Sequence, residues 1–149
     1  MTEIRFYHLT RKSLEQVLPE LLEKTLERGF RAVVMAGSPE RVEALTQHLW
    51  TYNPNSFLPH GNAKDGHADR QPIWLTAADE NPNKATFLFL TDGAESAHVG
   101  DYTRVCELFD GNDDAAVTTA RARWASYKAA GHDLSYWQQG ENGWSMRGG

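Results

Sequence analysis

The hydrophobic positions fall into short blocks whose spacing switches between strand-like and helix-like along the chain. Residues 4–9 are rich in aromatic and β-branched types, which predicts a strand, and apolar residues then recur at helical spacing over residues 14–28. Residues 31–36 form a continuous apolar run, as in a parallel strand covered on both faces, and residues 39–50 again show helical spacing. This order of strand, helix, strand and helix predicts a layered α/β domain.

Local signals mark where these two helices begin. Ser13 and Gln16 have the form of a capping box at the start of the first helix. Pro19 predicts a kink in that helix, or a start at the proline itself. Ser38 followed by Pro39 has the form of a cap with proline at the first helical position of the second helix.

The rest of the chain predicts three more strands and one long helix. After an irregular polar segment at residues 51–71, the strands are residues 73–75, 85–90 and 104–109, and the last helix ends near residue 130. The sequence thus predicts one domain over residues 1–137, with about five mostly parallel strands and helices on both faces. Residues 138–149 are Gly-rich and polar, and we expect them to form a mobile tail.

Composition narrows the classes of protein that the chain can belong to. Its 149 residues are enough for one domain with a core, and a net charge of −5 without a run of Lys or Arg disfavours direct binding of DNA. The lone cysteine, Cys106, excludes an intrachain disulfide and fits a reducing cytoplasm. There is no signal-peptide pattern and no apolar run long enough to span a membrane, so we expect a cytoplasmic protein.

Motifs for catalysis or cofactor binding are weak. The loop after the first strand, residues 10–12, contains no glycine, so the fold is expected to look Rossmann-like without a nucleotide site. Cys106 lies in an apolar run and is expected to be a buried thiol rather than a nucleophile. The His and Asp residues between 60 and 69 match no metal-ligand spacing and are interpreted as a solvated loop. We therefore expect no enzymatic activity, cofactor or metal, and a small nucleotide-binding α/β enzyme is the alternative.

The last helix carries the strongest candidate for a binding site. Trp124 and Tyr127 share one stripe of this helix, and Arg121 and Lys128 lie along its edge. A large ring flanked by two cations suits a ligand that has an apolar group beside an anion. In the alternative interpretation, the two rings pack into the core and the two cations cover their rim.

A second candidate surface lies around the irregular segment. Trp50 is followed by the run from Ser56 to His60, which contains Phe57 and Pro59. An aromatic residue near a proline in a long loop either tucks into the core or forms a patch for a protein partner. The spacing leaves both interpretations open.

The chain resembles the chi subunit family of bacterial DNA polymerase III, a component of the clamp-loader complex. The resemblance rests on four segments that together span nearly the whole chain: Phe6-Tyr7, Leu49-Trp50 with residues 56–60, residues 109–114, and residues 120–132. It implies a single α/β domain that needs no nucleotide and has no activity of its own. It also implies that the protein contacts DNA only indirectly and crosses no membrane.

The resemblance gives both candidate surfaces an expected partner. Members of this family hold the acidic C-terminal tail of single-stranded DNA-binding protein, which ends in phenylalanine, and pair with the psi subunit or an equivalent clamp-loader component. The positions of Arg121 and Trp124 match the family's tail site, and Tyr127 and Lys128 belong to the same motif. Trp50, Phe57 and Pro59 would form the psi-facing patch.

Two positions depart from the family's pattern. A basic residue usually follows the aromatic of the tail site, and here that position is Ala125, so Arg123 or Lys128 would have to supply the charge. An apolar position before the helix is Asp110 in this chain, which changes one wall of the expected slot.

Overall fold

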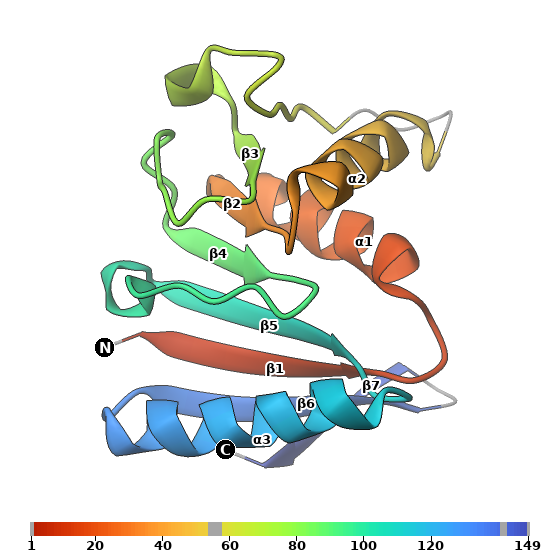
Figure 1. The fold of residues 1–149 in the computed structure, drawn as a ribbon, viewed down its shortest axis with the longest axis vertical. Coiled ribbons are helices and arrows are strands. Elements are labelled where there is room, and N and C mark those ends of the chain that lie inside the picture. Colours follow the sequence, from red (N-terminus) through yellow and green to blue (C-terminus); the bar gives the residue numbers. More distant parts are fainter. Residues whose placement is uncertain (1, 54–57, 141–142, 149) are drawn as a thin grey trace.

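The computed structural model describes residues 2–53, 58–140 and 143–148, and the described chain forms one seven-stranded sheet with three α-helices (Figure 1). The elements are β1 (Glu3–Leu9), α1 (Leu14–Glu27), β2 (Ala32–Met35), α2 (Pro39–Thr51), β3 (Ile73–Thr76), β4 (Phe87–Leu90), β5 (Arg104–Asp110), α3 (Asp114–Ala129), β6 (Asp133–Gly140) and β7 (Gly143–Gly148), with short 3-10 turns at Ala68–Arg70 and Val99–Asp101.

The strand order is β3-β2-β4-β5-β1-β6-β7, and every neighbouring pair is parallel except β6 with β7. Helices α1 and α2 pack on one face of the sheet and α3 packs on the other. The predicted fold class, a mostly parallel α/β layer with helices on both faces, is confirmed. The number of strands was wrong by two, because β6 and β7 were not expected.

The predicted helix boundaries are largely confirmed. The capping box forms, with the Ser13 N–H donating to Gln16 Oε1 over 2.9 Å. The helix begins at Leu14, so Pro19 lies inside it rather than at its start. At the second helix, Ser38 Oγ accepts a hydrogen bond from the Arg41 N–H at 3.2 Å, as expected for the cap before Pro39.

The C-terminal residues take part in the sheet. Residues 138–140 complete β6, and β7 pairs with it as an antiparallel hairpin in a segment where the sequence suggests a mobile tail. Trp144 of β7 packs edge-on against Tyr7, with 5.1 Å between the ring centroids. The polar composition of β6 hides its strand character, because its place beside β1 is fixed by pairing and by aromatic contacts rather than by an apolar run.

Within the described ranges, none of the helices has the length and apolar character that a bilayer crossing requires.

Candidate functional site

Helix α3 buries little of its surface against the sheet, and most of its residues are exposed. Ala120 is its one buried residue, Trp124 and Tyr127 are half-buried, and Arg121 and Lys128 are exposed. The Asp113 carboxylate caps the helix by accepting a hydrogen bond from the Ala115 N–H at 3.0 Å. The stripe expected from the sequence therefore exists, with its rings turned toward the sheet and its cations toward solvent.

Trp124 belongs to an aromatic cluster that joins α3 to the sheet. Its ring meets Phe6 of β1 at a centroid distance of 5.3 Å and Tyr136 of β6 at 6.1 Å, both edge-on. Tyr136 in turn lies 6.2 Å from Phe109 and 5.8 Å from His8. We call Phe6, His8, Phe109, Trp124 and Tyr136 the aromatic cluster. Edge-to-face pairs of this kind hold the rings in fixed orientations.

A hydrogen bond and a close backbone approach hold the cluster in place. His8 Nδ1 is hydrogen-bonded to the Tyr136 hydroxyl. The His8 ring also lies against the backbone of Gly111, where a Cβ would stand 1.9 Å from His8 Cδ2. Only glycine fits at this turn, because any side chain would displace the imidazole from Tyr136.

Arg121 lies three residues before Trp124 on α3, so the two side chains are neighbours on the helix surface. Burial raises the pKa of the Tyr136 hydroxyl, and the charge of Arg121 opposes that rise. The Arg121 side chain itself is exposed. Arg121, Trp124 and Tyr136 together offer an exposed cation on α3 near a partly open aromatic surface, which is the arrangement expected for binding an apolar group with an adjacent anion.

Tyr127 and Arg123 of α3 both bond to Glu107 of β5, and the Tyr127 ring also lies 6.0 Å from that of Phe6. The Tyr127 hydroxyl donates to Glu107 Oε2 at 3.0 Å, and Arg123 Nη1 donates to Glu107 Oε1 at 2.9 Å. Arg123 also donates to the carbonyl oxygens of Gly93 and Ala94, at 2.7 and 2.9 Å. Arg123 is thus committed to a buried pair, and it does not supply the surface charge that Ala125 lacks.

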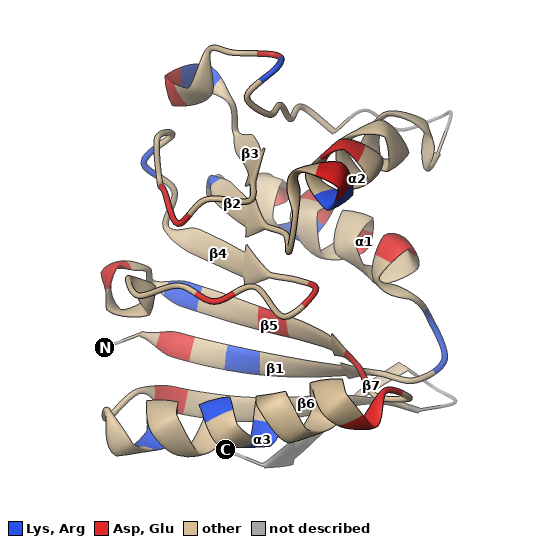
Figure 2. Cartoon of the chain, viewed as in Figure 1, with Lys and Arg blue, Asp and Glu red and all other residues tan. Residues whose placement is uncertain are grey.

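The four predicted site residues therefore have different roles. Trp124 packs in the aromatic cluster and Arg121 stands exposed three residues before it, whereas Tyr127 meets the cluster through Phe6 and uses its hydroxyl in the buried network with Glu107. Lys128 is exposed near the C-terminal end of α3. Figure 2 shows the same distribution of charge, with basic residues in the middle and C-terminal part of α3 and acidic residues at its start.

Sequence reasoning missed the sheet side of this surface. His8, Phe109 and Tyr136 were not proposed as site residues, although each contacts the cluster. The available signal was the alternation of Leu134 and Tyr136, which places both on the face that α3 covers.

Asp110 and Phe109 border both this surface and a neighbouring hollow. The Asp110 carboxylate accepts a hydrogen bond from the Asn112 N–H at 2.9 Å, which shapes the turn before α3. The same two residues line a hollow of about 750 Å³ at the C-terminal ends of β1 and β5. Arg121 and Trp124 are outside its lining, so they present an open surface rather than a closed pocket.

The loop between β1 and α1 occupies the position at which nucleotide-binding folds bind phosphate. The backbone N–H groups of Thr10, Arg11 and Lys12 all donate to Gln139 Oε1, at 2.9, 3.0 and 3.1 Å. Successive amides at a helix N-terminus form an anion-binding nest in nucleotide-binding folds. Here the side chain of β6 fills the nest, so these donors are already bonded.

The second predicted surface is described in part. Trp50 is exposed, and its ring lies 4.1 Å from that of His60. Pro59 is half-buried and Leu58 is buried in the core. Phe57 lies outside the described residues.

Cys106 and His60, the other residues considered for chemistry, have structural roles. Cys106 is buried, and burial raises the pKa of its thiol to about 12, so it is a protonated core residue at neutral pH. His60 is buried between the carbonyl oxygens of Leu58 and Thr46, with Nδ1 2.6 Å from the first and Nε2 3.0 Å from the second. In the part of the chain that the structure describes, no group of three His, Cys, Asp or Glu residues could hold a metal ion.

Comparison with known proteins gives a consistent result. Residues 1–135 match the family described as DNA polymerase III chi subunit, HolC. The chain is 32% identical over 108 residues to a protein of Rickettsia prowazekii named probable DNA polymerase III subunit chi, a match that covers 70% of this chain and 66% of the relative. It is 24% identical over 126 residues to DNA polymerase III subunit chi of Escherichia coli, covering 83% of this chain and 84% of the relative. The corresponding protein of Haemophilus influenzae is 23% identical over 137 residues, covering 88% and 93%.

Proposed function

Because this chain belongs to the DNA polymerase III chi subunit family, whose members are accessory subunits of the replicase, we propose that it binds the acidic C-terminal tail of single-stranded DNA-binding protein. Binding would use the surface formed by Arg121, Trp124 and the aromatic cluster, and it would link that protein to the polymerase. The observation that best supports this is that the exposed Arg121 stands three residues before Trp124 on the same side of α3, and that the half-buried Trp124 ring packs edge-on against Tyr136.

The chemistry of such a tail matches this surface part by part. A terminal phenylalanine ring would pack on Trp124 and Tyr136, and its free carboxylate would accept charge-assisted hydrogen bonds from Arg121. A phenylalanine at the C-terminus of a chain has a free carboxylate beside its ring, whereas an internal phenylalanine does not. Arg121 is therefore the residue that would make the surface selective for a chain end.

Charge along α3 gives the tail a direction. Asp113 and Asp114 lie at the N-terminal end of the helix and would repel acidic residues. Lys128 lies seven residues beyond Arg121, which is about 10 Å along the axis at a rise of roughly 1.5 Å per residue. We infer that the acidic residues of the tail run from Arg121 toward Lys128, away from the start of the helix.

We propose an accessory role without intrinsic activity, in keeping with the family of accessory subunits to which the chain belongs. We further propose that the exposed Trp50 and neighbouring Pro59 face a psi-like clamp-loader subunit. Tryptophan is among the residue types enriched at protein interfaces, and Trp50 is exposed while its ring packs on that of His60.

The proposed tail binding is tested with one labelled peptide in two forms. The peptide Glu-Asp-Asp-Asp-Phe carries an N-terminal fluorophore and has either a free C-terminal carboxylate or a C-terminal amide, and fluorescence anisotropy gives each dissociation constant. We expect saturable binding of the free acid, at least ten-fold weaker binding of the amide, and loss of affinity with added salt. Equal affinity for both forms, or no saturable binding of the free acid at low salt, would count against the proposal.

A further inference from the structure

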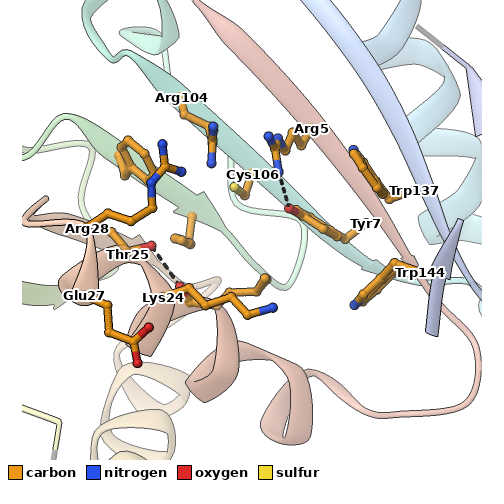
Figure 3. Close-up of a pocket in the computed structure, with 13 residues that line it drawn as sticks. Arg5, Tyr7, Lys24, Thr25, Glu27, Arg28, Arg104, Cys106, Trp137 and Trp144 are labelled. Carbon is orange, nitrogen blue, oxygen red and sulfur yellow. Dashed lines mark hydrogen bonds between the residues drawn. The ribbon is translucent and has the colours of Figure 1, made fainter. Parts of the chain in front are cut away.

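A second hollow lies on the opposite face of the sheet, between α1 and the β6–β7 hairpin (Figure 3). Its volume is about 450 Å³, which is within the range of pockets that hold small ligands or a few residues of a peptide. Arg5 and Tyr7 of β1 and Cys106 of β5 form its floor, because these alternate residues point to the same face. None of the residues of the proposed tail surface lines it.

One wall of this hollow is aromatic. Trp137 of β6 and Trp144 of β7 are both half-buried and line the hollow beside Tyr7. Trp137 is oriented by a hydrogen bond from Nε1 to Ser135 Oγ at 3.0 Å, and Trp144 by its edge-on contact with Tyr7. Both indoles therefore have fixed orientations and leave part of their surface uncovered.

The other walls are cationic. Arg5 and Arg104 point inward from the sheet and share the carboxylate of Glu3, and Lys24 and Arg28 lie on the rim from α1. Among the described residues, neither Lys24 nor Arg28 forms an ion pair with a carboxylate, and both are exposed.

Two carboxylates, Glu3 and Glu27, lie among these four cations, which leaves a local excess of two positive charges. The whole chain has a net charge of −5, so the net charge at this hollow is opposite in sign to that of the chain.

We propose that this hollow binds a short acidic peptide segment of a partner protein, with an aromatic side chain against the two indoles and flanking carboxylates on Lys24 and Arg28. Tryptophan, tyrosine and arginine are the residue types that dominate the centres of protein interfaces, and here all three converge on one pocket. The complementary charge of an acidic segment would compensate the excess that the chain itself leaves.

The shape of the site favours a peptide over single-stranded DNA. A nucleic acid needs a basic track that follows its backbone over several nucleotides, whereas these cations surround one hollow in an acidic chain. An internal peptide segment also needs no free carboxylate. The site is thereby distinct in chemistry, as well as in position, from the surface around Arg121.

The test uses the full chain and the N-acetylated, C-terminally amidated peptide Glu-Asp-Phe-Glu-Asp. Proton–nitrogen NMR follows the indole N–H signals of Trp137 and Trp144, which Trp137→Phe and Trp144→Phe variants assign. We expect both signals to shift saturably at micromolar to millimolar peptide. The Lys24→Gln/Arg28→Gln variant, which removes two charges and keeps helix-forming side chains, should bind at least ten-fold more weakly. Lys64→Gln/Arg70→Gln, the same charge change at exposed positions before β3, is the matched control and should bind as the parent does.

Three outcomes would overturn the proposal. The first is absence of a saturable shift at either indole, and the second is an equal loss of affinity in the control variant. The third is a shift of the same signals by a thymidine pentanucleotide that competes with the peptide, which would make the hollow a nucleic-acid site. Because the probe has no free C-terminal carboxylate, its result is independent of tail binding at Arg121.

Discussion

The Arg123 guanidinium lies 2.9 Å from Glu107 Oε1 and 3.2 Å from Oε2, and so pairs α3 with the centre of β5. The side chains are 14% and 7% exposed, so both charges are largely removed from water. Breaking such a pair from one side leaves an uncompensated buried charge. This pair therefore fixes the position of α3 and of the cations that the helix presents to solvent.

Replacing Arg123 with methionine should destabilise the protein by about 3–5 kcal/mol at neutral pH, because Glu107 would remain buried without its partner. Urea denaturation gives the free energy of unfolding. The Glu107→Gln/Arg123→Met variant should recover most of the loss, since it removes both charges. If the double variant were as unstable as the single one, packing rather than charge would be the cause.

The same single variant should show a characteristic pH dependence. Burial raises the pKa of Glu107 above its ordinary value of 4.5, although Arg123 opposes the rise. When the folded pKa is the higher one, the folded state binds more protons, and stability falls as the pH rises through that pKa. Without Arg123 the pKa should be higher still. The stability lost in Arg123→Met should therefore be smaller at about pH 5 than at about pH 8; a loss independent of pH would contradict this account.

Arg121→Ala should weaken binding of an acidic peptide with a C-terminal phenylalanine by about 1.5–3 kcal/mol, which is the value of a hydrogen bond to a charged group. Fluorescence anisotropy with the free-acid peptide measures the effect. The matched control is Lys64→Ala, because Lys64 is an exposed cation far along the chain from α3. A loss of the same size in the control would mean that net charge, and not a specific contact, is responsible.

Gly111→Ala should disrupt the aromatic cluster. The new Cβ would meet His8 Cδ2 at 1.9 Å and the Leu9 carbonyl oxygen at 2.9 Å, so His8 would have to leave Tyr136. We expect a loss of roughly 1–3 kcal/mol in unfolding free energy, typical of overpacking, together with weaker tail binding. Gly100→Ala is the control, because its Cβ would meet only His132 Cε1 at 3.9 Å. Unchanged stability in Gly111→Ala would show that the turn adapts without moving His8.

Gln139 offers a test of how the loop after β1 is stabilised. Gln139→Ala removes the acceptor shared by three backbone amides and should cost about 1–2 kcal/mol, since water replaces it only in part. Gln139→Glu keeps the acceptor and adds negative charge at a helix N-terminus, so it should retain or exceed the parent stability. Thermal unfolding measures both variants, and equal losses in the two would argue against an acceptor role.

Addition of ATP should leave the melting temperature of the parent protein unchanged, because the three backbone amides are already bonded to Gln139.

The sequence was sufficient for the elements with regular apolar patterns and insufficient for those fixed by long-range pairing. Strands β1 to β5 and all three helices follow from periodicity and caps, and Ser13 and Ser38 act as predicted. Strand β6 has no regular apolar run, so its local sequence does not mark it as a strand. Its strand character depends on β1, which lies more than 120 residues earlier in the chain.

The candidate site shows the same division. Arg121 and Trp124 could be identified from their spacing on one helix. The inward turn of Arg123 could not, because it depends on a buried Glu107 that sits in an otherwise apolar strand. The roles of Tyr136 and Trp137 could not be predicted either, because they depend on the pairing of β6 with β1, for which the local sequence gives no signal.

Strand β6 meets both proposed surfaces through neighbouring residues. Tyr136 pairs in register with Phe6 and faces α3, whereas Trp137 pairs with Tyr7 and faces the hollow beside α1. Side chains of a strand alternate between faces, so a slip of one position would exchange the two rings. An insertion or deletion within this strand would thus disrupt both proposed surfaces at once, so a change of length at either one is constrained by the other.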